Sequence, residues 1–205
     1  MSVRITPLAL LLGLAAAPVA AQGRPNFIAN LGFTSSTIGG SDATNDFKSR
    51  SGFFGGLGVQ LPFTDAMSGR FEVNYVTKGV ELPGDTEARN GVQTAYVDVP
   101  VMVQYTLGDQ TSSLRPAIFV GPSVGFEVSC DQQILTSTGF YSETKCIEPP
   151  TRNKVTFDFT VGGQVGISHF VLGMRYSYGF TRILKDSEEP SFKNRVFALT
   201  AGYTF

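Results

Sequence analysis

Apolar and polar residues alternate along this chain with a period of two, the spacing expected when successive side chains point to opposite faces of a β-strand. In the range 92–107, for example, Val97 and Val99 share one face while Asp98 and Pro100 share the other. The same alternation recurs between polar stretches and predicts eight strands. Their ranges are 26–34, 51–63, 69–80, 92–107, 114–129, 153–167, 170–182 and 195–205.

The connections between these predicted strands alternate in length. Those after the first, third, fifth and seventh strands are long and polar, whereas those after the second, fourth and sixth are short. An even strand number, with short periplasmic turns and long outer loops, is typical of bacterial outer-membrane barrels. The fold class that we expect is therefore all-β, an eight-stranded antiparallel up-and-down transmembrane β-barrel.

Aromatic residues gather near the predicted strand ends, as expected for the two girdles that mark the membrane interfaces of such a barrel. We therefore expect the apolar face of each strand to contact lipid. The set near the short turns is Phe63, Phe71, Tyr105, Phe170 and Phe205, and the set near the long loops is Phe53, Phe126, Phe157 and Phe180.

A soluble barrel of the lipocalin type, with apolar residues turned inward around a ligand, is the structural alternative. The polar faces mix charged residues with many Gly, Ala, Ser and Thr residues, which suits the crowded inside of a narrow barrel better than an open surface. The interior of an eight-stranded barrel is just wide enough for side chains to fill it. We expect Tyr96 and Phe119 to help block it, together with a salt-bridged plug of Arg70, Glu72, Lys78, Asp98, Arg115, Glu127, Asp158 and Arg175.

The first residues form a separate segment. A basic residue, Arg4, precedes an almost pure Leu and Ala run, and small residues follow at positions 19–21. This is the layout of a secretory signal peptide, and the run is too short for a transmembrane helix of about 20 apolar residues. We expect residues 1–21 to be the signal peptide and residues 22–205 to be one barrel domain in the bacterial outer membrane.

The composition agrees with a sheet that faces lipid. Charged residues make up 16% of the chain, below the usual ~25% of soluble domains. The formal net charge is −1, which gives no reason to expect a nucleic-acid partner. We expect a monomer whose partners are outer-membrane lipid and lipopolysaccharide. Basic residues at the predicted outer rim, which could contact lipopolysaccharide phosphates, are Arg152, Lys154, Arg182 and Lys185.

Several motifs resemble those of small outer-membrane β-barrel proteins often called "porin family" or PorT-like, which are similar in size to OmpA- and OmpX-type barrels. The motifs lie at residues 72–79, 96–105 and 116–126. The resemblance covers the whole predicted barrel domain and implies no shared catalytic residues, and the word "porin" does not establish a pore. The final residues also look like the signal read by the barrel-assembly machinery, in which Tyr203 and Phe205 would take part.

Candidate chemistry is sparse. Lipid A deacylases and palmitoyltransferases resemble this architecture and use a His with Ser and an acidic residue, but the single histidine, His169, lies in the shortest predicted turn, on the periplasmic side. We expect a turn histidine and no enzyme. One His and two Cys cannot complete a tetrahedral metal site without carboxylates, so we expect no metal and no cofactor. Acidic loop residues that are either weak cation ligands or solvated charges are Asp42, Asp46, Glu188 and Glu189.

Cys130 and Cys146 lie in one predicted outer loop of a chain that we expect to cross the oxidising periplasm, so we predict a disulfide between them. We expect the barrel to be a structural or interaction scaffold with a filled lumen that displays its outer loops. The alternatives are a small-solute porin and, third, a lipid-modifying enzyme. Wide aqueous channels need about 16 strands, which favours the scaffold.

Overall fold

The computed structural model describes residues 24–39, 48–82, 89–108, 112–135, 141–146, 153–181 and 193–205. The predicted signal peptide, residues 1–21, lies outside these ranges. No helix within them is long and apolar enough to cross a membrane. The strands are β1 (Asn26–Gly39), β2 (Lys48–Pro62), β3 (Met67–Leu82), β4 (Arg89–Thr106), β5 (Leu114–Leu135), β6 (Tyr141–Lys145), β7 (Val155–Ile167), β8 (Phe170–Gly179) and β9 (Lys193–Thr204).

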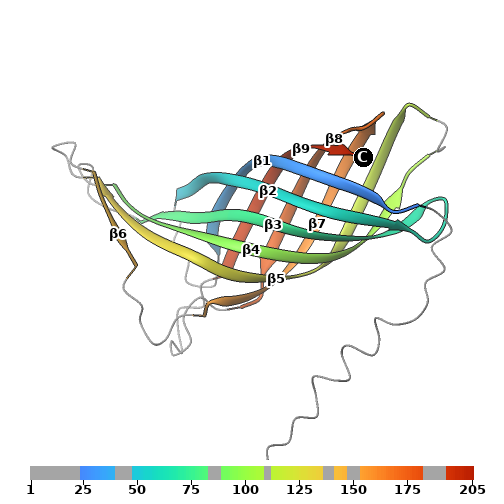
Figure 1. Ribbon diagram of the computed structural model, residues 1–205. Coiled ribbons are helices and arrows are strands. Elements are labelled where there is room, and N and C mark those ends of the chain that lie inside the picture. The colour runs from blue at the N-terminus through green and yellow to red at the C-terminus, as the bar shows by residue number, and fades with distance from the viewer. Residues whose placement is uncertain are drawn as a thin grey trace, which may run out of the picture.

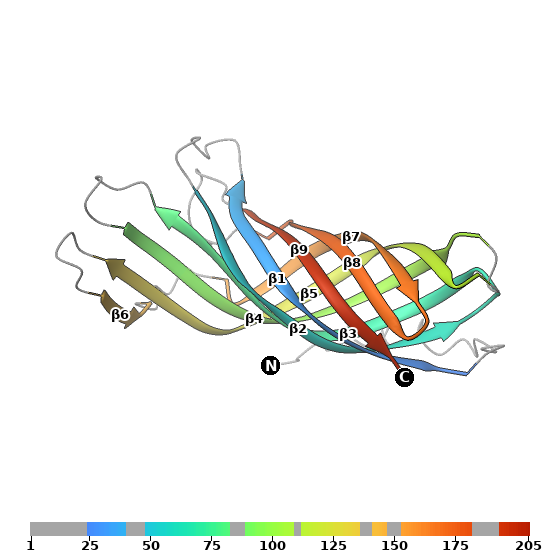
Figure 2. The same cartoon turned by 90° about the horizontal axis from the view of Figure 1, so that it is seen from above.

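The strands form one antiparallel sheet in the order β4-β3-β2-β1-β9-β8-β7-β5-β6, and a further pairing of β4 with β5 closes it into a barrel (Figures 1 and 2). Eight strands make the barrel wall, which confirms the predicted fold class. The seam joins the first strand to the last, from Ile28 opposite Thr204 to Gly39 opposite Lys193. The last strand thus closes the barrel against the first, as expected of an up-and-down barrel.

A ninth strand, β6, was not predicted. It pairs with the last residues of β5, where Asp131 lies opposite Lys145 and Leu135 opposite Tyr141. Figure 1 shows β6 at the end of the barrel opposite the C-terminus. Its sequence is polar and does not alternate, because a hairpin outside the barrel wall has no lipid-facing side that would impose the period of two.

Several strands run past their predicted ends toward the long connections. β1 continues to Gly39 instead of residue 34, and β5 continues to Leu135 instead of residue 129. The extra residues are mainly polar, yet their backbone groups remain paired with neighbouring strands. Hydrophobic alternation detects the segment that faces lipid, whereas backbone pairing carries the strand further.

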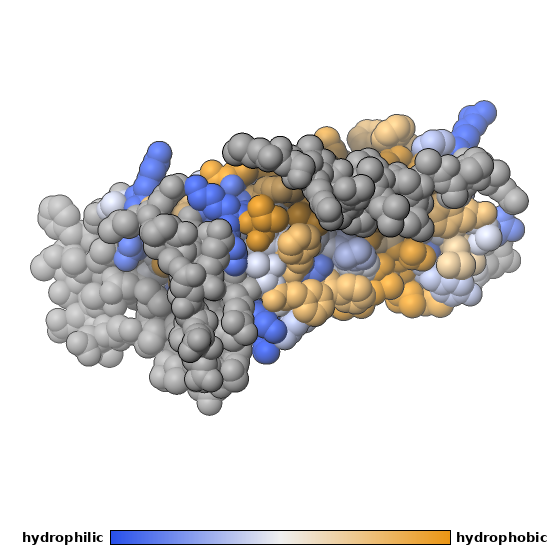
Figure 3. Space-filling model, turned by 90° about the horizontal axis from the view of Figure 1, so that it is seen from below, coloured by the Kyte–Doolittle hydropathy of each residue, from blue (hydrophilic) through white to orange (hydrophobic). Residues whose placement is uncertain are grey.

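The outward and inward faces of the barrel differ as the sequence predicts. On β9, Phe197 is 40% exposed and points outward, whereas Val196 is 5% exposed and points inward. The other strands repeat this pattern with exposed apolar residues outside and buried polar or charged residues inside. The face seen in Figure 3 carries apolar residues along the middle of the barrel and hydrophilic ones toward its ends. A soluble lipocalin-type barrel would have the opposite arrangement, so this alternative is excluded.

Candidate functional site

The lumen contains a buried group of charges, here called the arginine cluster, formed by Arg70 and Glu72 of β3 and Arg175 of β8. Glu72 is its central member and is 2% exposed. The Glu72 carboxylate accepts hydrogen bonds from Arg70 Nε on Oε1 and from Arg175 Nη1 on Oε2, the latter at 2.7 Å. Asn74 Nδ2 donates a further bond to Oε2 at 2.9 Å. A buried charge is stable only when it is paired and hydrogen-bonded in this way.

Aromatic rings complete the arginine cluster. The Phe119 ring of β5 faces both guanidinium groups, with its centroid 4.9 Å from Arg70 Cζ and 5.4 Å from Arg175 Cζ. Phe54 of β2 lies against Arg175 at 4.6 Å. A cation over an aromatic face is attracted by the negative face of the ring, and burial strengthens this attraction. Residues from four strands, β2, β3, β5 and β8, therefore converge on the axis of the barrel.

Small residues on β2 make room for this cluster. A Cβ atom built on Gly58 would lie 2.7 Å from the carbonyl oxygen of Phe71 and 2.8 Å from Cγ of Glu72. A Cβ on Gly56 would collide with the Asn74 amide. The Gly-rich run of β2 thus permits close packing against β3, which is a common reason for glycine within a strand.

A second group of charges, here called the lysine cluster, lies nearer the long connections and joins Lys78 of β3, Asp98 of β4 and Asp158 of β7. Lys78 Nζ lies 3.0 Å from Asp98 Oδ2 and 3.0 Å from Asp158 Oδ2. The Tyr96 ring faces the same ammonium group at 4.6 Å. The lysine cluster thus spans three strands of the barrel wall, and all its members are buried.

A small cavity of 20 Å³, which has room for about one water molecule, lies where the two clusters meet. Arg175, Asn74 and Asp98 are among the residues that line it. Among the described residues, Arg175 Nε and Asn74 Oδ1 are buried polar atoms without a hydrogen-bond partner. The cavity and these two atoms form the interface between the clusters.

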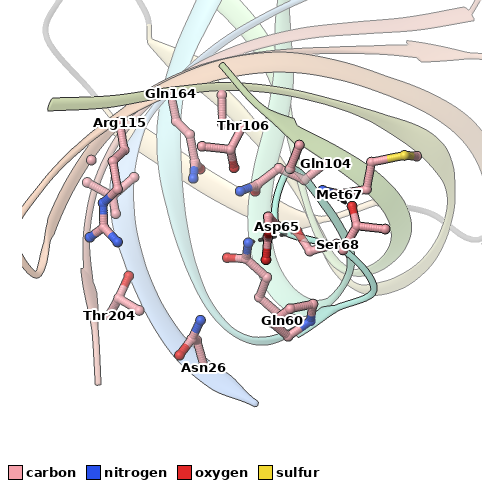
Figure 4. Close-up of a pocket in the computed structure, with 16 residues that line it drawn as sticks. Asn26, Gln60, Asp65, Met67, Ser68, Gln104, Thr106, Arg115, Gln164 and Thr204 are labelled. Carbon is pink, nitrogen blue, oxygen red and sulfur yellow. Dashed lines mark hydrogen bonds between the residues drawn. The ribbon is translucent and has the colours of Figure 1, made fainter. Parts of the chain in front are cut away.

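A larger polar cavity of 280 Å³ opens at the short-turn end of the barrel, where Gln60, Asp65 and Thr204 line it (Figure 4). Figure 4 shows Gln104 and Gln164 reaching into it. Both glutamine side-chain oxygens accept hydrogen bonds from Arg70 Nη1, at 3.1 Å for Gln104. The cavity is therefore a vestibule that ends at the arginine cluster.

Two of the predicted plug residues lie away from the clusters. Arg115 is exposed at the short-turn end, where its Nη2 donates to the carbonyl oxygen of Ser168 at 2.7 Å. It follows the first residue of β5, and the lumen has already opened into the vestibule at that level. Glu127 lies toward the long connections, half-buried, with Oε2 3.5 Å from the Tyr96 hydroxyl. It reaches the lysine cluster through Tyr96.

The sequence interpretation left Phe54 and Asn74 out of the plug. Asn74 shares a strand face with Arg70 and Glu72, so the period of two alone could have included it. Phe54 follows Phe53, which the period of two places on the lipid-facing side, so the same rule could have included Phe54. Gly56 and Gly58 face the lumen with Phe54.

The remaining predicted residues lie outside the lumen. His169 is exposed in the β7–β8 turn, stacked on Tyr203 with ring centroids 5.5 Å apart. In the described part of the chain no three His, Cys, Asp or Glu side chains come together as a metal site. The acidic loop residues Asp42, Asp46, Glu188 and Glu189 lie outside the described ranges.

The predicted disulfide between Cys130 and Cys146 is present, with the two Cα atoms 5.4 Å apart. It links the end regions of β5 and β6, beyond the part of β5 that pairs with β7. At the opposite end, Phe205 N donates to the Phe27 carbonyl oxygen at 2.9 Å. The assembly signal expected at Tyr203 and Phe205 stays a prediction.

Several solved structures resemble this chain at low sequence identity. No curated protein matches the chain. Ail of Yersinia pestis is 15% identical, with a TM-score of 0.48 over 89% of this chain and 100% of its own. OprG of Pseudomonas aeruginosa is 15% identical, with a TM-score of 0.46 over 88% of this chain and 95% of its own. Neisserial surface protein A is 12% identical, with a TM-score of 0.47 over 87% of this chain and 97% of its own.

Residues 20–185 match the sequence pattern of a family described as "Outer membrane protein beta-barrel domain". These residues span β1 to β8 and include every member of both lumen clusters. Since the match extends over most of the chain, the protein belongs to the outer membrane protein beta-barrel domain family.

Proposed function

We propose that this protein is a closed structural or interaction scaffold of the bacterial outer membrane that displays its long connections outside the cell. The observation that carries the proposal is the clamp across the lumen, in which Glu72 of β3 binds Arg175 of β8 while Phe119 of β5 faces the same guanidinium group. The clamp joins distant parts of the barrel wall at the axis, where a solute would have to pass.

The energy of this clamp opposes transport. An eight-stranded barrel is just wide enough inside for side chains. A passing solute would have to separate Glu72 from its guanidinium partners, and leaving one member of a buried ion pair unpaired costs about 3–5 kcal/mol. The lysine cluster adds a second barrier on the same axis. Together they support a lumen without a steady aqueous path.

The two ends of the barrel support the proposed orientation. The short connections, such as the Ser168–His169 turn, lie with the C-terminus at one end. The β5–β6 hairpin and its disulfide lie at the other end (Figure 1). Outer-membrane barrels direct their short turns to the periplasm. The hairpin is then part of the displayed surface, and an interaction partner would meet it from outside the cell.

The absence of catalysis is part of the proposal. His169 hydrogen-bonds through Nδ1 to the hydroxyl of its own neighbour, Ser168, at 3.1 Å. Both residues are exposed in the turn at the proposed periplasmic end. A 290 Å³ cavity borders the His169 ring, but no Asp or Glu of the described residues lines it. A general base needs a positioned substrate proton and an orienting partner within hydrogen-bond reach, and this cavity supplies no acidic partner for the histidine.

Planar-bilayer recordings of the refolded protein test the scaffold proposal. We expect no steady conductance from the wild-type protein, because both clusters block the axis. The Phe119→Ala, Arg175→Ala double variant removes the ring and the guanidinium that cross the lumen, and it should give openings under the same conditions, which shows that the assay detects a path. A stable wild-type channel would overturn the proposal and support the small-solute porin alternative.

A further inference from the structure

Two basic side chains lie on the outer face of β9, between its apolar residues and the long connection that precedes the strand. Lys193 and Arg195 point to the same side of the strand as Phe197 and Leu199, because they share the period of two. Phe197 and Leu199 are exposed apolar residues of the kind that contacts lipid. The change from apolar to basic side chains therefore marks the level at which the barrel leaves the hydrocarbon region.

The side chains of this pair gather around one ring. Lys193 Nζ lies 5.9 Å and Arg195 Cζ 5.8 Å from the centroid of Tyr178 on β8. A Cβ atom on Gly39 of β1 would collide with the Arg195 guanidinium, so this glycine leaves the space in which the side chain lies. No carboxylate of the described residues lies within ion-pair distance of either cation. The exposed Arg195 and the half-buried Lys193 are therefore open to an anion that approaches from outside the barrel wall.

An apolar groove of 980 Å³ crosses the outer wall from Phe53 of β2 over β1, β9, β8 and β7 to Pro116 of β5, near the short connections. Small residues lower its floor, since Gly163 of β7 and Ala201 of β9 both line it. A Cβ on Gly163 would meet the carbonyl oxygen of Ala117 at 3.7 Å, an ordinary contact, so the groove is open above it. Larger lining side chains from β1, β5, β8 and β9 are Leu31, Phe33, Ile118, Leu172, Met174 and Leu199.

We propose that Lys193, Arg195 and Tyr178 bind the phosphate of a phosphorylated glycolipid of the outer leaflet, lipopolysaccharide, whose acyl chains lie in the groove below. This inference rests on the proposed outward orientation of the long connections. Phosphate oxygens accept strong, charge-assisted hydrogen bonds from ammonium and guanidinium groups. Basic side chains at the membrane surface attract anionic head groups, and the apolar groove matches the chains attached to them.

The geometry of the strand links the two parts of the site. Leu199 borders the groove and lies on the same face as Arg195, about 13 Å further along β9 at roughly 3.3 Å per residue. A single lipid therefore spans the basic and apolar parts. A protein partner does not fit as well, because the groove lies in the apolar wall that faces the bilayer.

This site differs from the rim that the sequence indicated. Of the four basic residues expected there, the structure describes Lys154, which is exposed, while Arg152, Arg182 and Lys185 lie outside the described ranges. Lys193 and Arg195 were not singled out from the sequence, because the cation pair becomes visible only when β8 and β1 are placed beside β9.

Native mass spectrometry of the full-length protein in detergent, titrated with purified bis-phosphorylated lipid A or its dephosphorylated form, tests the inference. We expect the wild-type protein to prefer the phosphorylated lipid. The Lys193→Gln, Arg195→Gln double variant should bind it about tenfold or more weakly, with unchanged affinity for the dephosphorylated lipid. The matched control Lys48→Gln, which removes another exposed cation from the same end, should leave both affinities unchanged.

A separate variant tests the role of the groove. Gly163→Leu fills it and should weaken binding of both lipids, whereas Val161→Leu, on the same outward face of β7 but outside the lining, should not. Heat-modifiable migration confirms that each variant is folded. Equal wild-type affinity for the two lipids, or equal losses in the Lys48 control, would overturn the inference. Because the readout is lipid binding, a barrel that conducts ions yet passes this test refutes the scaffold proposal alone.

Discussion

The arginine cluster and the lysine cluster have the same arrangement of three charges, with the signs of the charges reversed. In the first, Glu72 lies between two guanidinium groups, so two positive charges against one negative leave a formal charge of +1. In the second, Lys78 lies between two carboxylates, which leaves a formal charge of −1. Each cluster has a central member that makes two ion pairs and two outer members that make one each.

This difference shows how a narrow lumen can contain six buried charges. Neither cluster is neutral alone, and the excess of one offsets the excess of the other across the 20 Å³ cavity. Charges of low accessibility need such compensation because their hydration is lost on burial. The comparison also separates two roles, since loss of a central residue leaves two like charges, whereas loss of an outer one leaves a matched pair.

Replacing a central residue should have the largest effect. Glu72→Gln leaves Arg70 and Arg175 without a carboxylate, and Lys78→Met leaves Asp98 and Asp158 without a cation. Each variant should lower the free energy of unfolding by about 3–5 kcal/mol. Urea unfolding of the protein refolded in lipid vesicles measures this change, with Ser35→Ala on the outer face of β1 as the control. Near wild-type stability of both variants would contradict the central role of Glu72 and Lys78 in their clusters.

Replacing an outer residue should cost less. Arg175→Met leaves the Arg70–Glu72 pair, and Asp158→Asn leaves the Lys78–Asp98 pair. We expect a loss of about 1–3 kcal/mol for each, the usual cost of removing a hydrogen-bond partner from a buried group. The same urea transitions give the values. If the outer variants were as unstable as the central ones, the distinction between central and outer members would fail.

Coupling between the clusters should be smaller still. Arg175 and Asp98 line the same cavity from opposite clusters. In a double-mutant cycle of Arg175→Met and Asp98→Asn we expect an interaction energy of about 0.5–1 kcal/mol, because removing both opposite charges restores part of the balance. Strict additivity would mean that the two clusters stabilise the barrel independently.

Breaking the disulfide should have the smallest effect on the barrel. In the chain-entropy model a loop of this size contributes about 3 kcal/mol, but the bond lies in the β5–β6 hairpin outside the barrel wall. Reduction should therefore move the barrel's unfolding free energy by less than about 0.5 kcal/mol while loosening the hairpin. Intact mass without reductant should be two hydrogens lighter than the dithiol, and two alkylatable thiols would refute the bond.

The sequence predicted the barrel because the membrane imposes a simple pattern. Residues such as Val97 and Phe197 alternate with lumen residues wherever lipid covers the outer face, so strand number and inward faces could be read directly. The hairpin strand β6 and the end of β5 lie beyond the lipid-facing wall, and there the pattern no longer applies.

The ion-pair partners of the lumen charges could not be predicted from the alternation of residues. Parity places Arg70, Lys78 and Arg175 inside, but it does not say which carboxylate each one meets. That choice depends on strand register and on the tilt of the barrel, which brings Glu72 to Arg175 across 103 positions of sequence. Arg115 shows the same limit. The period of two places it on the inward face of β5, but it lies at the short-turn end of the barrel, where the lumen has widened into the vestibule.

The seam between β1 and β9 has a consequence for the rate of folding. Thr204 pairs with Ile28, so the wall is completed by contacts between residues at the two extremes of the domain. Contacts of such large sequence separation form slowly, because the entropy of bringing distant chain segments together must be overcome before the contact contributes. Hairpins such as β7–β8 can form early, whereas the cylinder closes last. Until then the free edges of β1 and β9 remain open to pairing with other chains, which makes the unclosed sheet the aggregation-prone stage of biogenesis.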